Sequence, residues 1–167
     1  MNICYDHIDT PIGRMLLAGN ADGLTHVGLP EARHPLAIPP GWQRDPRTLA
    51  TASRQFEAYF AGTLDAFDLR LAPRGTPFQR QVWDALLSIP YGVTISYVEL
   101  ARRIGKPAAS RAVGLANGAN PLAIVIPCHR VIGANGSLTG YGGGLTAKRF
   151  LLDLERRHAA REPLTLN

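Results

Sequence analysis

Cys128, His129 and Arg130 follow one another directly after an apolar run, and their types suggest covalent chemistry. A thiolate is a strong nucleophile, and neighbouring positive charge lowers the pKa of a thiol below its ordinary value of about 8.5. We therefore expect Cys128 to be an activated nucleophile, with an inert buried cysteine as the alternative. In an extended segment Cys128 and His129 would point to opposite faces, so they could pair only through a turn or a bridging water.

The segments around this tripeptide must position the cysteine. Residues 122–126 form a continuous apolar run, which predicts a buried strand ending at Pro127. Asn117-Gly118 and Asn120-Pro121 precede that run and are turn signals. We expect a turn, a strand and then the cysteine.

Two capping boxes indicate that the second half of the chain is helical. Thr76-Pro77-Phe78-Gln79 opens one helix, whose apolar stripe continues to Pro90. Ser96-Tyr97-Val98-Glu99 opens a second, which ends at Gly105, and a third follows over residues 108–117. Two short helices joined this tightly predict a helix-turn-helix, with an ordinary helical corner as the alternative. The third helix carries mostly small side chains besides Arg111, a surface suited to the DNA minor groove, although alanines there also favour helix formation.

The first half has the pattern of an antiparallel sheet with one helix. Strands are predicted at residues 3–8, 15–18 and 24–29, and Asp22-Gly23 marks a hairpin. Residues 30–46 hold five prolines and should contain no regular structure. A helix is expected over 48–60 and a strand over 67–71, before a boundary near Gly75. These features predict an α+β protein with an N-terminal domain at 1–74 and a C-terminal domain at 75–167.

Composition and charge limit the function classes. The chain has 167 residues, of which 46% are hydrophobic and 19% charged, so it is not intrinsically disordered. No apolar run approaches the roughly 18 residues that cross a bilayer, and we expect a cytoplasmic protein without membrane contact. Residues 1–73 carry a net charge of −2 and residues 74–167 a net charge of +7. A basic second half is typical of proteins that bind polyanions, although a solvated basic surface gives the same count.

The motif Ile126-Pro127-Cys128-His129-Arg130-Val131 resembles the active-site signature of the O6-alkylguanine-DNA alkyltransferases, also called methylated-DNA–protein-cysteine methyltransferases. The resemblance extends over residues 75–157, through segments 75–79, 95–97, 110–114, 120–121, 140–143 and 151–155. It implies a ribonuclease H-like N-terminal sheet with a helix, and a mainly helical, winged-helix-like C-terminal domain. The first half is similar only in pattern.

The resemblance also implies a role for each matching residue. Cys128 would accept the alkyl group from O6 of guanine, while Glu155 orients His129, which takes the thiol proton through a water. Asn120 would fix the turn that presents the cysteine, and Tyr97 would donate to guanine N3. Three residues would form the substrate pocket: Val131 through its carbonyl, Gly142 through its N–H, and Tyr141 as a lip.

By the same resemblance, the partner is double-stranded DNA containing O6-alkylguanine, with O4-alkylthymine as a further candidate substrate. The damaged nucleotide would be rotated out from the minor-groove side, at a cost of a few kcal/mol. Arg111 would fill the vacated space, and Ser110, Ala112 and Tyr97 would also contact DNA. Since a thioether is a poor leaving group, we expect an S-methyltransferase that acts once. The resemblance also implies a monomer that needs no cofactor. Cooperative assembly on DNA is left open.

Two other functions compete with this one. A non-catalytic helix-turn-helix protein would bind the lesion without reacting, which the presence of Cys128 disfavours. A Cys-His hydrolase would use Cys128 and His129, but the sequence shows no separate oxyanion loop and the hydrolase does not explain Arg111. Zinc is not expected, because Cys4 and His7 have only His26 and His34 as further ligands in this half.

Overall fold

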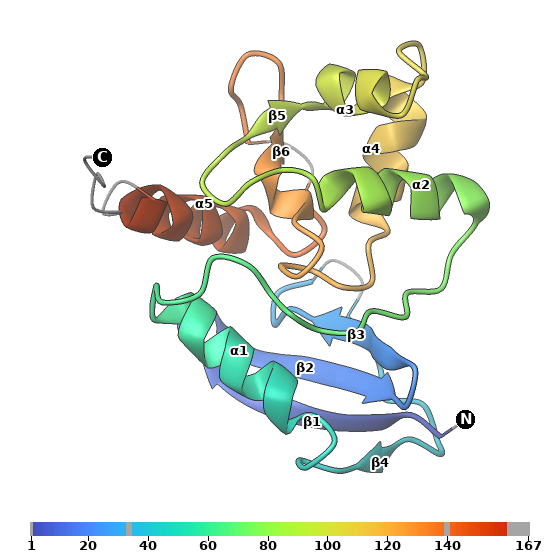
Figure 1. Cartoon of the computed structure of the whole chain (residues 1–167), viewed down its shortest axis with the longest axis vertical. Coiled ribbons are helices and arrows are strands. Elements are labelled where there is room, and N and C mark those ends of the chain that lie inside the picture. Colours follow the sequence, from blue (N-terminus) through green and yellow to red (C-terminus); the bar gives the residue numbers. More distant parts are fainter. Residues whose placement is uncertain (1, 33–34, 139–140, 160–167) are drawn as a thin grey trace, which may run out of the picture.

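The computed structural model describes residues 2–32, 35–138 and 141–159 of the chain. The sheet-bearing half and the helical half lie against each other, and α5 (Leu145–Ala159) lies beside their junction (Figure 1). The hydrogen bonds that link them include one from Val27 N to Pro121 O at 2.8 Å and one from Tyr59 Oη to Glu155 at 2.6 Å. Within the described ranges, no helix combines the length and apolar composition needed to cross a bilayer.

The predicted antiparallel meander is confirmed. Strands β1 (Cys4–Thr10), β2 (Gly13–Asn20) and β3 (Gly23–Gly28) are neighbours in a sheet of order β3-β2-β1-β4. Gly23 has φ +138°, and a Cβ there would lie 2.5 Å from Arg70 O, so the hairpin requires glycine at this position. Helix α1 (Ala50–Phe60) lies against the sheet and buries Ala52, Phe56 and Tyr59.

Two expectations for the first half are wrong in part. Residues 30–46 contain a strand, β4 (Gln43–Arg44), which pairs parallel with β1. Residues 43–45 include no proline, so Gln43 N can donate to Ile3 O, just before β1, and Asp45 N to Tyr5 O. Residues 67–71 do not form a strand: only Leu71 bridges to Leu24. The segment meets β3 only at its end, where Leu24 N donates to Arg70 O and Ala72 N donates to Leu24 O, both at 2.8 Å. Earlier in the segment, the Phe67 ring packs against the ring of Phe56, with centroids 5.0 Å apart.

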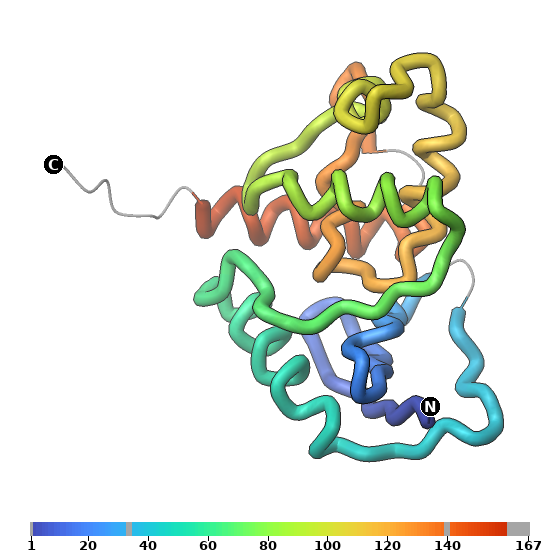
Figure 2. The backbone as a smooth tube through the Cα atoms, turned by 45° about the vertical axis from the view of Figure 1, so that its right-hand side comes forward, coloured from blue at the N-terminus to red at the C-terminus, as the bar shows by residue number. Residues whose placement is uncertain are grey.

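The helical half contains the predicted helix-turn-helix. Helix α2 (Pro77–Leu86) begins with the Thr76–Gln79 capping box, and α3 (Tyr97–Arg103) is capped by the Ser96 hydroxyl. Helix α4 (Ser110–Gly118) packs against both, and Trp83 Nε1 of α2 donates to Ala116 O of α4 at 2.8 Å. The path of the backbone from α2 through α4 can be followed in Figure 2. Short strands β5 (Ile95–Ser96) and β6 (Val131–Ile132) pair in parallel beside them.

Candidate active site

Residues 120–127 form a tight turn, which includes residues 122–126, where the sequence predicts a strand. Asn120 Oδ1 accepts from Leu122 N at 3.0 Å, and Asn120 Nδ2 donates to Ile126 O at 2.8 Å. Ile126 N donates to Leu122 O at 2.9 Å, and Ile124 has φ +74°, which is rare for a β-branched residue. The apolar residues of the run are buried as expected, but in a turn. Asn120 thus occupies the place that its predicted role requires.

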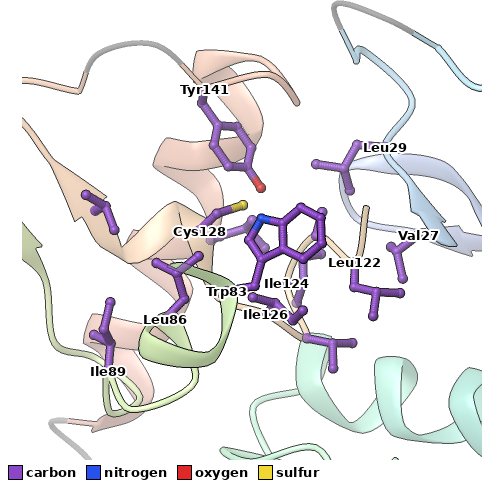
Figure 3. Close-up of a cluster of buried hydrophobic side chains, with 14 of the residues drawn as sticks. Val27, Leu29, Trp83, Leu86, Ile89, Leu122, Ile124, Ile126, Cys128 and Tyr141 are labelled. Carbon is purple, nitrogen blue, oxygen red and sulfur yellow. The ribbon is translucent and has the colours of Figure 1, made fainter. Parts of the chain in front are cut away.

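Cys128 begins a short 3₁₀ helix, η1 (Cys128–Arg130), at the end of this turn. Its side chain is 5% exposed, and in Figure 3 the Tyr141 hydroxyl points toward its sulfur. Burial raises the pKa of the thiol, and contacts with Asn120 and Tyr141 and the charge of Lys148 oppose this only in part. The expectation that neighbouring charge from His129 and Arg130 lowers this pKa is therefore wrong. Cys128 needs a base that removes its proton during the reaction.

Glu155 of α5 binds both His129 and Arg130, the two residues that follow Cys128. Its Oε2 lies 2.6 Å from His129 Nε2, and its Oε1 accepts from Arg130 Nε at 2.7 Å. Arg130 Nη1 donates to Ile89 O at 2.7 Å, so this guanidinium faces Glu155 and not the thiol. Burial favours the neutral acid, but the hydrogen bonds and charges of His129 and Arg130 outweigh it and hold the pKa of Glu155 far below its usual range. Glu155 is therefore a carboxylate.

His129 is fully buried and oriented by that carboxylate. Because an anionic Oε2 accepts, Nε2 carries the proton and Nδ1 of the neutral ring is left as the basic nitrogen. Nδ1 makes no hydrogen bond with any described residue. Burial lowers the pKa of His129, and Glu155 raises it only in part. The ring is thus neutral near pH 7, with a free acceptor.

Lys148 is a buried cation that the sequence interpretation missed. It lies on the apolar face of α5, where Nζ donates to Val131 O at 2.7 Å and sits 5.8 Å from the Tyr141 ring centroid. Burial lowers the pKa of Lys148, while the Cys128 thiolate would raise it. Lys148 is therefore placed to stabilise negative charge on Cys128.

Cys128 opens onto a pocket of about 220 Å³ between the two halves. Four predicted site residues line it: Cys128, Asn120, Tyr141 and Gly142. The opposite wall comes from β3 and the segment after it, through residues 26–29.

Three other predicted site residues are not part of the described lining of the pocket: Val131, His129 and Glu155. The Val131 carbonyl accepts a hydrogen bond from Lys148. Asn117, with its Oδ1 unpaired among described atoms, also lines the pocket and was not singled out from the sequence. Gly140 lies outside the described residues.

The predicted DNA-contacting residues lie on α3 and α4. Tyr97 begins α3, and a Cβ on Gly114 of α4 would lie 3.8 Å from its ring. Arg111 and Ala112 are exposed on α4 and Ser110 is half-buried at its start. Leu115, one helical turn after Arg111, is 79% exposed. None of these residues is part of the described lining of the pocket, which α4 reaches through Asn117 and Gly118.

No group of three or more His, Cys, Asp or Glu side chains in the described ranges could hold a metal ion. Of the histidines considered with Cys4, His7 lies on β1 and His26 pairs with the Thr25 hydroxyl at 2.8 Å. His34 lies outside the described residues.

Comparison with known proteins identifies the family. Residues 3–73 match the family description "6-O-methylguanine DNA methyltransferase, ribonuclease-like domain", and residues 77–157 match "6-O-methylguanine DNA methyltransferase, DNA binding domain". The chain belongs to the 6-O-methylguanine DNA methyltransferase family. The resemblance seen in the second half of the sequence thus extends to the first.

Individual relatives agree with this assignment. The methylated-DNA–protein-cysteine methyltransferase of Methanosarcina barkeri is 55% identical over 154 residues, covering 92% of this chain and 98% of the relative. The crystal structure of Mycobacterium tuberculosis OGT in complex with DNA superposes with a TM-score of 0.87 at 54% identity, covering 93% and 94% of the two chains. The O6-methylguanine-DNA methyltransferase from Pyrococcus kodakaraensis, at 22% identity and a TM-score of 0.63, shares the fold and covers 92% of this chain and 98% of its own.

Proposed function

We propose that this protein repairs DNA by transferring the alkyl group from O6 of guanine irreversibly to Cys128. The observation that carries the proposal is that Cys128 opens onto the pocket, while the next residue, His129, is buried outside the described lining and is held by Glu155. A buried thiol with a raised pKa needs such a base. The family membership supplies the reaction class, and the residue roles below are our assignments.

The proposed step is a displacement at the alkyl carbon. His129 Nδ1 takes the Cys128 proton through a bound water, and Sγ attacks the carbon attached to O6. The S–C bond forms as the C–O6 bond breaks, and the electron pair passes to the guanine ring. Tyr97 lies at the start of α3 and outside the described lining of the pocket, so the base would have to reach it for its hydroxyl to donate a proton to N3. Glu155 balances the imidazolium, Lys148 stabilises the developing thiolate, and the thioether persists, because it is a poor leaving group.

The pocket and α4 divide recognition between them. Tyr141 and Gly142 would close over the flipped base, and the Gly142 N–H would face O6, while the Val131 carbonyl would have to bind the exocyclic amine beside Lys148. Arg111 would enter the duplex in place of the base, with Ser110 and Ala112 close to the backbone. We assign recognition and chemistry to a domain at 75–167, supported by a domain at 1–74. A monomeric state and a cytoplasmic location stay predictions of the sequence.

Labelled O6-methylguanine in duplex DNA tests the proposal. We expect at most one methyl group per protein, located on Cys128 by peptide mass spectrometry, and none in Cys128→Ala. Cys4→Ala, which removes the other thiol of the chain, should react normally. Continued turnover would instead support a hydrolase, and tight binding without transfer would support a non-catalytic lesion binder.

A further inference from the structure

Tyr59 reaches from the sheet-bearing half into the group of residues behind Cys128. It belongs to α1, is 1% exposed, and donates from its hydroxyl to Glu155 Oε2 at 2.6 Å. That oxygen is the one that also faces His129 Nε2 at 2.6 Å. The two donors are separated by 70 residues in sequence and meet on a single carboxylate oxygen.

We infer that Tyr59 is a positioning residue for alkyl transfer: its hydroxyl holds Glu155 Oε2 against His129 and limits how strongly the carboxylate draws on the imidazole. This inference rests on the proposed function. It gives the N-terminal half a part in proton transfer, through Glu155 and His129, in addition to supporting the C-terminal half.

The argument depends on how the charge of Glu155 is shared. Oε2 accepts from Tyr59, from His129 and, at 3.1 Å, from Arg130 Nη2. Oε1 accepts from Arg130 Nε at 2.7 Å and from Gly92 N at 3.2 Å. Each donor that binds the carboxylate leaves less negative charge for the others. Removing one donor from Oε2 should therefore strengthen its bond to His129.

The surroundings of Tyr59 keep its hydroxyl protonated, so that it remains a hydrogen-bond donor. Burial, and then the charge of Glu155, raise the pKa of Tyr59 well above its usual value, so the phenol stays protonated throughout the working range. Among the described residues, the other charged or titratable groups that interact with Glu155 or His129 are Arg130, Lys148, Tyr91 and Tyr141. The Tyr91 hydroxyl is buried and makes no hydrogen bond with a described residue. Among the tyrosines near Glu155, Tyr59 is thus the one with a short bond to the carboxylate.

The consequence concerns the protonation of His129. A protonated ring cannot take the proton from Cys128, so the transfer rate falls as the pH drops through the pKa of His129. Without the Tyr59 hydroxyl, Glu155 stabilises the imidazolium more strongly and that pKa rises. The acidic limb of the pH–rate profile should then move to higher pH. One lost hydrogen bond corresponds to a shift of about 0.5 to 1 pH unit.

The test compares Tyr59→Phe with Tyr91→Phe in single-turnover transfer from O6-methylguanine duplex DNA across pH 5 to 9. Tyr91→Phe is the matched control, because it removes the same atom from a neighbouring ring without taking a donor from Glu155. We expect the acidic limb of Tyr59→Phe to lie about 0.5 to 1 pH unit above that of the unmodified protein, and that of Tyr91→Phe to coincide with it. Coinciding limbs for all three proteins, or an equal shift in both variants, would overturn the inference.

Site-specific incorporation of 3-fluorotyrosine at position 59 tests the same idea in a variant that keeps the hydroxyl group. The more acidic phenol is a stronger donor, so the limb should move to lower pH, opposite to Tyr59→Phe. A shift in the same direction as Tyr59→Phe, or none, would count against the inference even if Tyr59→Phe were poorly folded. Failure of the proposed function is distinguishable, because the unmodified protein would then transfer no methyl group at any pH.

Discussion

At the residue scale, the site depends on how Glu155 satisfies two buried partners at once. Arg130 and His129 are both buried, and both direct nitrogen atoms at this carboxylate. An isolated buried guanidinium is costly, so the carboxylate is needed for stability as well as for chemistry. Gly92 completes the arrangement: its N–H reaches Glu155, and with φ +77° a Cβ there would lie 2.7 Å from Ala159 Cβ.

We predict that Glu155→Gln destabilises the protein by roughly 3 to 5 kcal/mol at pH 7.5, because Arg130 keeps its burial and loses its counter-charge. The contribution of a carboxylate with a lowered pKa is fully present above about pH 5 and is lost as the pH falls through the folded-state pKa. The difference between the two proteins should therefore shrink below pH 4. Urea unfolding at several pH values measures it.

Asp153→Asn is the matched control for that prediction. Asp153 is an exposed carboxylate on the same helix, 3.8 Å from Arg156, and its removal should change the free energy of unfolding by less than about 1 kcal/mol. If Glu155→Gln were no more destabilising than Asp153→Asn, the buried ion pair would not have the importance given to it here.

At the element scale, the sequence predicts what local signals encode and misses what tertiary contacts decide. Capping boxes locate α2 and α3, since Thr76 and Ser96 bond to their own helices. The sequence predicts a strand at 122–126, where the structure has a turn, because an apolar run has the same composition in both forms. The hydrogen bonds of Asn120 and the positive φ of Ile124 distinguish them in the structure.

The site itself was predicted in the same uneven way. Cys128 and His129 are recognisable from the motif at residues 126–131, and Asn120 and Glu155 from other segments of the family resemblance. In the structure Asn120 holds the turn before Cys128, and Glu155 holds His129. Lys148 was missed because lysine is normally expected on the outside of a helix. Tyr59 falls within the helix predicted over residues 48–60, but its hydroxyl contact depends on a partner 96 residues away, which no local pattern contains.

Helix α4 carries its own prediction, because Arg111 is exposed and is not part of the described lining of the pocket. Arg111→Ala should slow transfer from duplex DNA by roughly 30-fold, equivalent to about 2 kcal/mol of lost compensation for base flipping. Transfer from the free alkylated base should be almost unchanged, since it requires no flipping. Arg156→Ala, which removes an exposed arginine from α5, is the control. Equal losses on both substrates would remove the proposed role of Arg111 in the duplex.

At the scale of the whole molecule, the pocket is a junction between the two halves. Residues 26–29 form one wall, and Cys128, Tyr141 and the end of α4 form the other. The junction is further tied by the hydrogen bonds from Val27 to Pro121 and from Tyr59 to Glu155. A change at the sulfur of Cys128 should therefore alter the packing of the residues that hold the two halves together.

Methylation of Cys128 should destabilise the folded chain for this reason. The added carbon must fit between the sulfur and the Tyr141 hydroxyl that points toward it (Figure 3), and the buried Lys148 loses a group that could carry negative charge. Overpacking of this kind costs about 1 to 3 kcal/mol, and for a chain of this size that lowers the melting temperature by roughly 3 to 9 °C. Calorimetry of the protein after reaction with O6-methylguanine DNA and removal of the DNA measures the change, with Cys128→Ala treated identically as the control. A benzyl group should lower the melting temperature further than a methyl group, whereas an unchanged or higher value after methylation would mean that the pocket accepts the product without strain on the junction.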